Sequence, residues 1–339
     1  MPMATIKDVA REAGASISTV SKALNGSYTI SAETTEHIKQ VAARLGYRPN
    51  ARAQMLARKA TRSIVFLAEF GKNTAFENPH MFEILSGAES ALREKDYAVT
   101  LQHCNTKDVC HLSKEIMNRK SADGLLIHAS VVTKELSLML SREEVPHMII
   151  GKPDFTNNLC WIDNDNSLSG ELAARKLKEL GHKKILLIAG LEDDHISEDR
   201  CKGIRIGLGS LELAAVFRGF PTIEEGRRMG LEALELPERA TAVICTNNFL
   251  AVGCLRAFAR QNVKVPEDMS LITFDDYPFA KFTDPPLTTV SIDLHDLGVQ
   301  AGKMLMVKIR KPSLHVQSYS TLPTLIERQS TAMVELEGG

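Results

Sequence analysis

The chain has 339 residues, with 41 Lys and Arg against 42 Asp and Glu, a formal net charge of -1 and 44% hydrophobic residues. This composition excludes a disordered, collagen-like or coiled-coil protein, and the length predicts two or three domains. No apolar run reaches the roughly 18 residues that span a bilayer, and charges alternate where a signal peptide would be apolar, so we expect a cytoplasmic protein. Dispersed cysteines without a CxxC pair indicate reduced thiols.

The charge is unevenly distributed along the chain. Residues 1–60 contain nine basic and four acidic groups, a net charge of +5, whereas the other 279 residues carry -6. A basic N-terminal segment on an acidic body can meet phosphate with one part of the chain and keep the rest away from it. A solvated helical surface would have the same charge, so charge alone leaves both interpretations open.

The N-terminal segment predicts three short helices. Thr5 and Asp8 have the spacing of a capping box before a first helix that ends at Gly14, where glycine can adopt the positive φ of a tight turn. Ser16 would cap a second helix and Ser31 a third, each with an apolar stripe on one face. Two short helices around a glycine turn match the helix-turn-helix pattern.

After residue 62, apolar runs alternate with amphipathic stretches. The expected strands are residues 64–70, 98–104, 124–128, 148–150, 185–188, 242–245 and 271–274, and the expected helices include 81–95, 169–180, 224–236 and 249–261. Such alternation predicts parallel sheets with helices on both faces, and about 270 residues suit two lobes of this kind.

Polar side chains gather where these strands end, which is where open parallel sheets bind ligands. They are Glu69, Asn105, His128, Asp163, Asp193, Asn247, Asp275 and Asp276, with Arg200 opening a helix and with Phe70, Trp161, Phe220 or Phe274 as aromatic walls. Carboxylates, an amide and a guanidinium beside aromatic rings suit a polyhydroxylated ligand. Helix caps and strand-end turns use the same residue types, so that interpretation stays open.

An enzyme or a metal site has less support. The acidic neighbours Asp275 and Asp276 could do acid–base chemistry, but no nucleophile elbow, P-loop or HExxH motif accompanies them. His–Cys neighbours at residues 103–104 and 110–111 could hold a metal, yet chance placement explains them better. We therefore expect no catalytic residue, no metal and no cofactor. A solute-binding protein is another alternative, but it would need a signal peptide and has no use for residues 1–60.

The run TIKDVAREAGASISTVSKALN at residues 5–25 and the run LGYRPN at residues 45–50 resemble the DNA-binding head of the lac repressor/galactose repressor family of bacterial transcription regulators. The resemblance continues through PLTTV at residues 286–290 and IERQST at residues 326–331, so it covers essentially the whole chain. It implies a small all-α helix-turn-helix head joined by a hinge to an α/β body of two Rossmann-like lobes, similar to periplasmic sugar-binding proteins.

The resemblance also implies domain bounds. The head would be residues 1–47, the hinge helix and linker 48–61, the first lobe 62–162 with 290–322, and the second lobe 163–289 with 323–339. The chain would cross between the lobes near Asp163, Val290 and Leu322.

In the family, the second helix of the head enters the major groove. The resemblance implies that Ile17, Ser18 and Lys22 face the bases, and that the phosphate contacts are Ser16, Thr19, Ser21, Asn25 and Ser31. Lys22 stands where arginine is commoner, and lysine donates to guanine as a point charge without the arginine fork. Thr19 and Ser21 could instead be ordinary helix surface.

Residues 50–58 resemble the family's hinge, which becomes helical only on the operator. Asn50, Ala53 and Leu56 are the implied contacts there, and Leu56 would wedge into the central base step from the minor groove and kink the duplex. Gln54 stands where many relatives have arginine. Without the resemblance, these residues would be interpreted as the tail of the third helix or a linker.

For the effector, the resemblance matches Arg200, Asn247 and Asp275 to positions where relatives hydrogen-bond effector hydroxyls. Asp163 and Phe220 are further matches, and Phe70 is a candidate wall. His80 replaces a usual aromatic residue in the loop facing the ligand, which favours a more polar or anionic effector unless His80 is simply an exposed loop residue.

These observations predict a sequence-specific DNA-binding transcriptional regulator, a repressor that binds pseudo-palindromic operator DNA as a homodimer. A small molecule between the lobes, a sugar or sugar derivative, would switch its operator affinity. A corepressor-dependent regulator is the alternative, because nothing in the sequence encodes the direction of the switch. Residues 335–339 contain no leucine heptad, so we expect a dimer and no tetramer.

Overall fold

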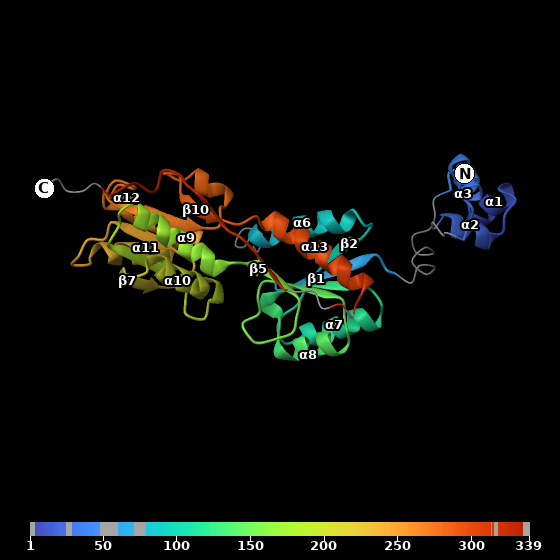
Figure 1. The fold of residues 1–339 in the computed structure, drawn as a ribbon, viewed down its shortest axis with the longest axis horizontal. Helices are drawn as coiled ribbons and strands as arrows, with labels where there is room; N and C mark the ends of the chain where they lie inside the picture. The colour runs from blue at the N-terminus through green and yellow to red at the C-terminus, as the bar shows by residue number, and fades with distance from the viewer. Residues whose placement is uncertain are drawn as a thin grey trace.

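The computed structural model describes residues 4–24, 29–47, 60–70, 79–312, 314 and 318–334. They form a helical head and two α/β lobes, which follow one another along the long axis in Figure 1. Among the described residues, no helix is both long and apolar enough to cross a bilayer.

The head consists of three helices, α1 (Ile6–Glu12), α2 (Ile17–Leu24) and α3 (Ala32–Arg44). The Asp8 carboxylate accepts hydrogen bonds from the Thr5 amide and hydroxyl at 2.9 and 2.7 Å, which confirms the capping box. The Ser16 and Ser31 hydroxyls accept from amides three residues on, as predicted for helix caps. The buried side chains of the three helices form a core of their own.

The first lobe contains one six-stranded sheet in the order β11-β5-β4-β3-β1-β2, with all its pairs parallel. Its elements in chain order are β1 (Ser63–Ala68), α6 (Pro79–Arg93), β2 (Ala98–His103), α7 (Val109–Asn118), β3 (Gly124–His128), η1 (Ala129–Val131), α8 (Lys134–Arg142), β4 (His147–Ile150), β5 (Trp161–Asn164), α13 (Leu294–Arg310) and β11 (Tyr319–Thr321).

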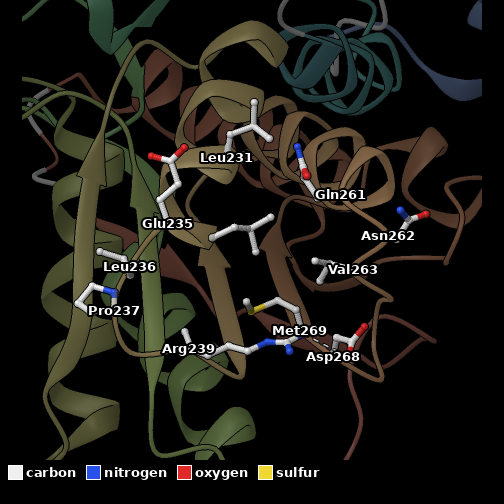
Figure 2. Close-up of a pocket in the computed structure, with 13 residues that line it drawn as sticks. Leu231, Glu235, Leu236, Pro237, Arg239, Gln261, Asn262, Val263, Asp268 and Met269 are labelled. Carbon is white, nitrogen blue, oxygen red and sulfur yellow. Dashed lines mark ion pairs between the residues drawn. The ribbon is translucent and has the colours of Figure 1, made fainter.

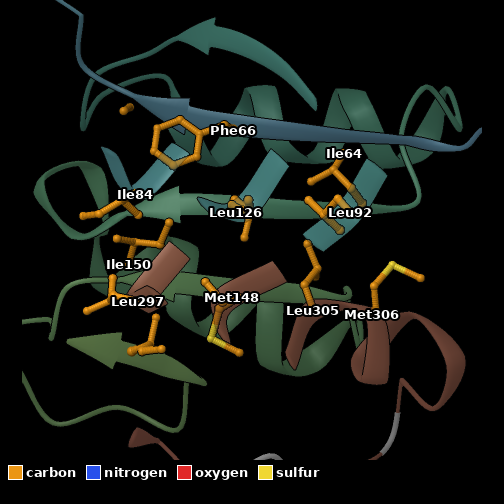
Figure 3. Close-up of a cluster of buried hydrophobic side chains, with 14 of the residues drawn as sticks. Ile64, Phe66, Ile84, Leu92, Leu126, Met148, Ile150, Leu297, Leu305 and Met306 are labelled. Atoms are coloured by element: carbon orange, nitrogen blue, oxygen red, sulfur yellow. The ribbon is translucent and has the colours of Figure 1, made fainter. Parts of the chain in front are cut away.

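Successive side chains of β1 point to opposite faces of this sheet, as the period of two requires. Ile64 and Phe66 pack under α6 and α13, where Figure 3 shows them with Leu92 and Leu305. Side chains of the opposite parity, such as Val65, pack on α7 and α8 instead. Both faces of the sheet are therefore buried, which explains the continuous apolar runs of the strand sequences.

The second lobe repeats this design with the strand order β12-β10-β9-β8-β6-β7, in which only β12 pairs antiparallel among the described strands. Its elements are α9 (Asn166–Glu179), β6 (Ile185–Ala189), α10 (His195–Leu208), β7 (Leu213–Arg218), α11 (Ile223–Leu234), β8 (Ala242–Cys245), α12 (Asn248–Arg260), β9 (Ser270–Phe274), η2 (Pro278–Lys281), β10 (Thr288–Ser291) and β12 (Thr324–Ile326). Helices α11 and α12 cover one face, and α9 and α10 cover the other.

The chain passes between the lobes where strands of one sheet lead into elements of the other. Strand β5 leads into α9, β10 leads into α13, and β11 leads into β12. These passages bring the carboxyl ends of both sheets toward the junction of the lobes. Side chains that follow the strands therefore meet across it.

Each predicted strand and helix of the body begins and ends within three residues of an observed one. The first strand ends at Ala68, before the predicted end, and leaves Phe70 in the segment that follows. Elements that the apolar pattern did not single out include β5, β7, β10, β11, β12, α7, α8 and α13.

Paired helices approach closely at glycines. A Cβ on Gly170 of α9 would lie 2.0 Å from the Arg200 carbonyl oxygen, and one on Gly203 of α10 would lie 1.7 Å from the Ser167 carbonyl oxygen. Side chains larger than hydrogen are therefore excluded at this crossing. The close approach places the first turn of α9 beside Arg200.

Candidate functional site

Helix α2 of the head has one buried and one open face. Val20 and Ala23 are fully buried in the core of the head. Ile17, Ser18 and Lys22 are exposed, and Ile17 leaves 45% of its surface open although it is apolar. The open face of α2 is therefore available to a partner, and it carries one cation and one apolar group.

The hydroxyl groups beside this face take part in local hydrogen bonds. The Ser16 hydroxyl lies 2.8 Å from that of Thr19, and the Ser31 hydroxyl donates to Thr34 at 2.8 Å. Ser21 is half-buried. The other predicted DNA contacts, Asn25, Asn50, Ala53 and Leu56, and the whole hinge at residues 50–58, lie outside the described residues.

Arg200 is the centre of a second group of polar side chains, at the junction of the lobes. The sequence predicted that Arg200 opens a helix, but α10 begins at His195 and Arg200 lies in its second turn. Its guanidinium forms a two-pronged ion pair with Asp275, with Nη1 to Oδ2 at 2.9 Å and Nη2 to Oδ1 at 2.6 Å. Both side chains are buried, at 5% and 7% exposure. Burial disfavours the Asp275 carboxylate, but the Arg200 guanidinium outweighs it and holds the pKa of Asp275 below its usual value.

Three further groups fix the guanidinium. Nε of Arg200 donates to the Asn166 side chain at 3.2 Å, and Nη1 donates to the Thr246 carbonyl oxygen at 2.8 Å. The guanidinium also lies 4.7 Å from the centre of the Phe274 ring, a cation–π distance. The orientation of Arg200 is therefore fixed without any ligand.

Asp275 is fixed through its backbone. Its φ is +62°, in the left-handed region that non-glycine residues rarely adopt. The buried Asn248 amide donates to the carbonyl oxygens of Phe274 and Asp275, which secures this turn at the end of β9. The Asn248 Oδ1 atom is buried and has no hydrogen-bond partner among the described residues.

His80 connects the first lobe to this group. Its ring meets the Tyr277 ring edge-on, with the ring centres 4.5 Å apart. Burial lowers the pKa of His80, while the Asp275 carboxylate opposes this shift, and the Nε2 atom of the ring is buried without a partner in the described part of the chain. His80 is therefore a partly buried residue in the first turn of α6 at the lobe junction, which corrects the alternative of an exposed loop histidine.

Asp163 and Asn247 lie next to the Arg200 group. Asp163 lies near the carboxyl end of β5, where its carboxylate accepts from the Lys152 and Asn164 amides at 2.8 and 2.7 Å. Burial raises the pKa of Asp163, while Arg200 opposes this shift. Asn247 caps α12, and its side chain accepts from the Phe249 amide at 2.8 Å. Both residues thus also have the capping and turn roles that the sequence left open.

Of the four candidate aromatic walls, Phe274 contacts the Arg200 guanidinium, and Trp161 begins β5 with the Lys152 ammonium 5.8 Å from its ring centre. The other two, Phe70 and Phe220, lie outside the hydrogen-bonded group. Phe70 packs against the core of the first lobe, with its ring centre 6.2 Å from that of Phe66. Phe220 follows the edge strand β7 and is 63% exposed.

Two pockets at the lobe junction include members of the group. One of about 380 Å³ contains Asp163 and Asn166, and one of about 410 Å³ contains His80 and Tyr277. A pocket of about 780 Å³ lies at the other end of the second lobe, where β8 and β9 begin. Figure 2 shows the Arg239–Asp268 ion pair at one end of it. This pocket lies where β9 begins, whereas Asp275 follows the other end of that strand.

Four members of the Arg200 group were missed by sequence reasoning. They are Asn166, Thr246, Asn248 and Tyr277. Asn248 and Tyr277 lie within two residues of predicted site positions, so a wider window around each strand end would have included them. Asn166 offered no signal beyond its place at a helix start.

The family model for bacterial regulatory proteins of the lacI family matches residues 5–50, and the model for a periplasmic binding protein-like domain matches residues 174–331. The chain is 30% identical to the HTH-type transcriptional repressor PurR of Histophilus somni strain 2336 over 336 residues, covering 97% of this chain and 99% of that one. It is 33% identical to PurR of Haemophilus influenzae strain PittEE, covering 98% and 100%.

Solved structures of regulators share the fold. The lac repressor dimer bound to operator and the anti-inducer ONPF has a TM-score of 0.79 at 23% identity, covering 98% of this chain and 100% of that one. The complex of the transcriptional regulator CelR with cellobiose has a TM-score of 0.71 at 26% identity, covering 96% and 99%. A regulator of Enterococcus faecium with bound ribose has a TM-score of 0.69 at 22% identity, covering 80% and 100%.

A helix-turn-helix head on a two-lobed body of this kind defines a DNA-binding regulator with an effector-binding domain. The chain belongs to the lacI family of bacterial regulatory proteins. The fold class and the family resemblance inferred from the sequence are confirmed.

Proposed function

We propose that the chain is a transcriptional repressor that binds a pseudo-palindromic operator as a homodimer in the cytoplasm. A small molecule bound between the lobes sets its operator affinity. The observation that carries the proposal is the Arg200–Asp275 ion pair, buried at the lobe junction of a chain whose other end is a helix-turn-helix head.

A carbohydrate or carbohydrate derivative is the proposed effector. The ion pair offers a donor and an acceptor side by side, which suits the hydroxyl groups of a sugar. Solved relatives that hold cellobiose and ribose support this class. The proposed ligand contacts are Arg200, Asn247, Asp275 and Asp163, with His80, Phe70 and Phe220 around them.

The mechanism follows from the two-lobed design. A ligand that contacts both lobes favours one lobe arrangement over the other by its difference in affinity for the two. The change in lobe arrangement is transmitted to the operator through the dimer contact and the hinges. The operator affinity can change by no more than the ligand's difference in binding free energy for the two arrangements. The ligand can either release the operator or promote its binding in this design. A fall in operator affinity on ligand binding identifies an inducer, and a rise identifies a corepressor.

Operator recognition is proposed for the open face of α2. Ile17, Ser18 and Lys22 would contact base edges, and the hydroxyl groups beside them would contact phosphates. The hinge wedge proposed for Leu56 rests on the sequence, since this residue lies outside the described part of the chain.

The test begins with thermal-shift screening of the purified chain against sugars, sugar phosphates and nucleosides, because ligand binding raises the melting temperature. The operator affinity is then measured with and without the ligand by fluorescence anisotropy. A hydrogen bond to a charged group contributes roughly 1.5–3 kcal/mol. Asp275→Ala should therefore weaken ligand binding at least about tenfold and remove the operator response, while operator binding without ligand persists.

Asp275→Ala leaves a buried guanidinium unpaired, which costs roughly 3–5 kcal/mol of stability. Asp275→Asn keeps the shape and one acceptor, and it replaces the alanine variant if that chain unfolds. Glu238→Ala, which removes an acid from a surface ion pair of the second lobe, is the matched control. A full operator response in both Asp275 variants would move the effector site elsewhere.

A further inference from the structure

One carboxylate fixes the point at which the chain enters the first lobe. Thr61 and Arg62 are the last residues before β1, and they lie beside the half-buried Asp123, which directly precedes β3. The Oδ1 atom of Asp123 accepts from the Thr61 amide at 2.8 Å and from the Thr61 hydroxyl at 2.9 Å, and its Oδ2 atom accepts from the Arg62 amide at 3.0 Å. Hydrogen bonds to an ionised group are stronger than those between neutral groups. A single side chain therefore holds both residues against the start of β3.

Arg62 ties the same segment to the neighbouring strand β2. Its guanidinium donates to the Lys95 carbonyl oxygen at 2.6 Å and lies 5.1 Å from the centre of the Tyr97 ring. Its own carbonyl oxygen accepts from the Ala98 amide at 2.9 Å. The φ of Arg62 is +56°, a left-handed conformation that a non-glycine residue keeps only where its surroundings determine it. The entry segment is thus attached on both sides of β1.

Asp123 is separate from the two sites described above. It lies where β3 begins, whereas the Arg200 group follows the carboxyl ends of the strands. It belongs to the body and not to the helix-turn-helix head. In Figure 1, the segment before β1 leaves the first lobe at the end nearest the head. Asp123 can therefore act on the passage between body and head without contacting an effector or a base.

The stiffness of this passage decides how precisely the body can place two heads. A residue whose backbone is not fixed samples many conformations, and each such residue widens the reach of the chain that follows it. In a dimer, the separation of the two heads must match the separation of the two half-sites. A fixed entry segment narrows the range of separations, and a loose one widens it.

We propose that Asp123 is a positioning residue, which makes residues 61 and 62 part of the rigid first lobe and thereby sets the selectivity for the spacing of operator half-sites. The inference rests on the proposed function, because it concerns a dimer on a pseudo-palindromic operator. Without the carboxylate, each head still binds a single half-site. The dimer, however, becomes less able to reject an operator with the wrong spacing.

The first test measures spacing selectivity by fluorescence anisotropy with the full chain. The probes are an operator selected in vitro, the same duplex with one or two base pairs inserted between its half-sites, and a duplex with a single half-site. Insertion should weaken binding of the wild type by about tenfold or more, because the second head no longer reaches its site. Asp123→Ala should lose affinity by a factor at least about three times smaller, since a looser passage restores that reach. Both chains should bind the single half-site equally well.

Two further variants separate positioning from stability. Asp123→Asn keeps an acceptor for Thr61 and loses the one for the Arg62 amide, so its loss on insertion should be intermediate, and it replaces the alanine variant if that chain unfolds. Asp268→Ala is the matched control, because Asp268 precedes β9 of the second lobe and its carboxylate accepts from the Lys264 amide at 2.8 Å. This control should keep the loss of the wild type. An undiminished loss in both Asp123 variants, or an equal decrease in Asp268→Ala, would overturn the proposal.

The second test follows the exchange of backbone amide hydrogens and needs no DNA. Mass spectrometry of a peptide that spans residues 60–64 should show slow exchange in the wild type, because the Thr61 and Arg62 amides donate to Asp123. Asp123→Ala should exchange there about tenfold faster or more, as local opening becomes easier. Unchanged exchange would refute the claim that Asp123 makes this segment rigid.

These outcomes differ from those of a failed proposed function. A chain that bound two half-sites no better than one would contradict the proposed dimeric repressor, yet amide exchange would still decide whether Asp123 fixes residues 61 and 62. A wild type that bound two half-sites better than one at every spacing would refute the inference and leave the proposed function standing.

Discussion

Asp275 keeps a backbone conformation that costs a non-glycine residue roughly 1–3 kcal/mol. Its φ of +62° persists because the Asn248 side-chain amide donates to its carbonyl oxygen and the Arg200 guanidinium donates to its carboxylate. Glycine would adopt this φ freely but has no carboxylate. The strained turn therefore combines a tight end to β9 with an acid aimed at the lobe junction.

Lys22 is the residue on which we expect base preference to depend most. It is exposed on the open face of α2, and a direct base contact contributes roughly 1–3 kcal/mol of discrimination. Lys22→Ala should therefore weaken binding to an operator selected in vitro by this amount and relax the preference at one base pair of each half-site. Anisotropy titrations against single-base variants of that operator measure both effects.

Lys39→Ala is the matched control for Lys22, because it removes an exposed lysine from α3 of the same head. Its effect should be the same on every operator variant. If Lys22→Ala also weakened all variants equally and lowered the salt dependence, Lys22 would be a phosphate contact, contrary to the prediction.

Residue types at strand ends predicted part of the lobe-junction group. Arg200 and Asp275 were matched through the family resemblance, and the structure joins them in one ion pair. The roles of Asn166 and Asn248 could not be predicted, because one accepts from a guanidinium on another helix and the other donates to two backbone carbonyls. Hydrogen-bond partners of this kind lie on different elements and meet only in the folded chain, so no spacing in the sequence predicts them.

At the scale of elements, burial on both faces made several interior strands visible in the sequence, although the exposed edge strand β2 was also predicted and the interior strands β5 and β10 were missed. The strands β1, β3 and β8 lie inside their sheets, so they are continuous apolar runs that pattern analysis detects. The strands β7, β11 and β12 lie at sheet edges and are partly exposed, and β11 and β12 contain three residues each. Their sequences resemble loops because neighbouring strands, and not their own pattern, hold them in place.

The crossing of α6 and α13 provides a test of helix packing. A Cβ on Gly298 would lie 1.9 Å from the Ile84 carbonyl oxygen, which is fixed in its helix. Gly298→Ala must push the helices apart, and overpacking of this kind costs roughly 1–3 kcal/mol or more. We expect a lower urea midpoint of unfolding for this variant, measured by circular dichroism.

Gly302→Ala, one turn further along α13, is the control. Its Cβ would lie 3.0 Å from the Ala88 carbonyl oxygen, which requires a shift of only a few tenths of an ångström. Alanine also improves helix propensity by about 1 kcal/mol, so the net change should be small. Equal losses in the two variants would mean that the contact at Gly298 does not determine the helix spacing.

At the scale of the molecule, a net charge near zero is the average of two unlike parts. The first 60 residues carry +5 and the rest carry -6, and the head has a core separate from those of the lobes. The alternating pattern predicted two α/β lobes, but it could not predict that the chain passes repeatedly between them. Periodicity indicates that a segment is a strand but not which sheet contains it. In the structure, β10 and β12 belong to the second sheet, whereas β11, which lies between them in the chain, belongs to the first.

At the scale of the whole molecule, we expect the two heads of a dimer to bind the two halves of one operator at the same time. A pseudo-palindromic operator presents two related half-sites, and one helix-turn-helix reads one of them. Engagement of both sites at once raises affinity by roughly 10²–10⁴ over a single contact, so a duplex with one half-site should bind at least about 100-fold more weakly. Light scattering should give twice the 37.3 kDa of one chain. The mass of a single chain, together with equal affinity for duplexes with one and two half-sites, would contradict the predicted dimer. The mass of four chains would contradict the prediction that no tetramer forms.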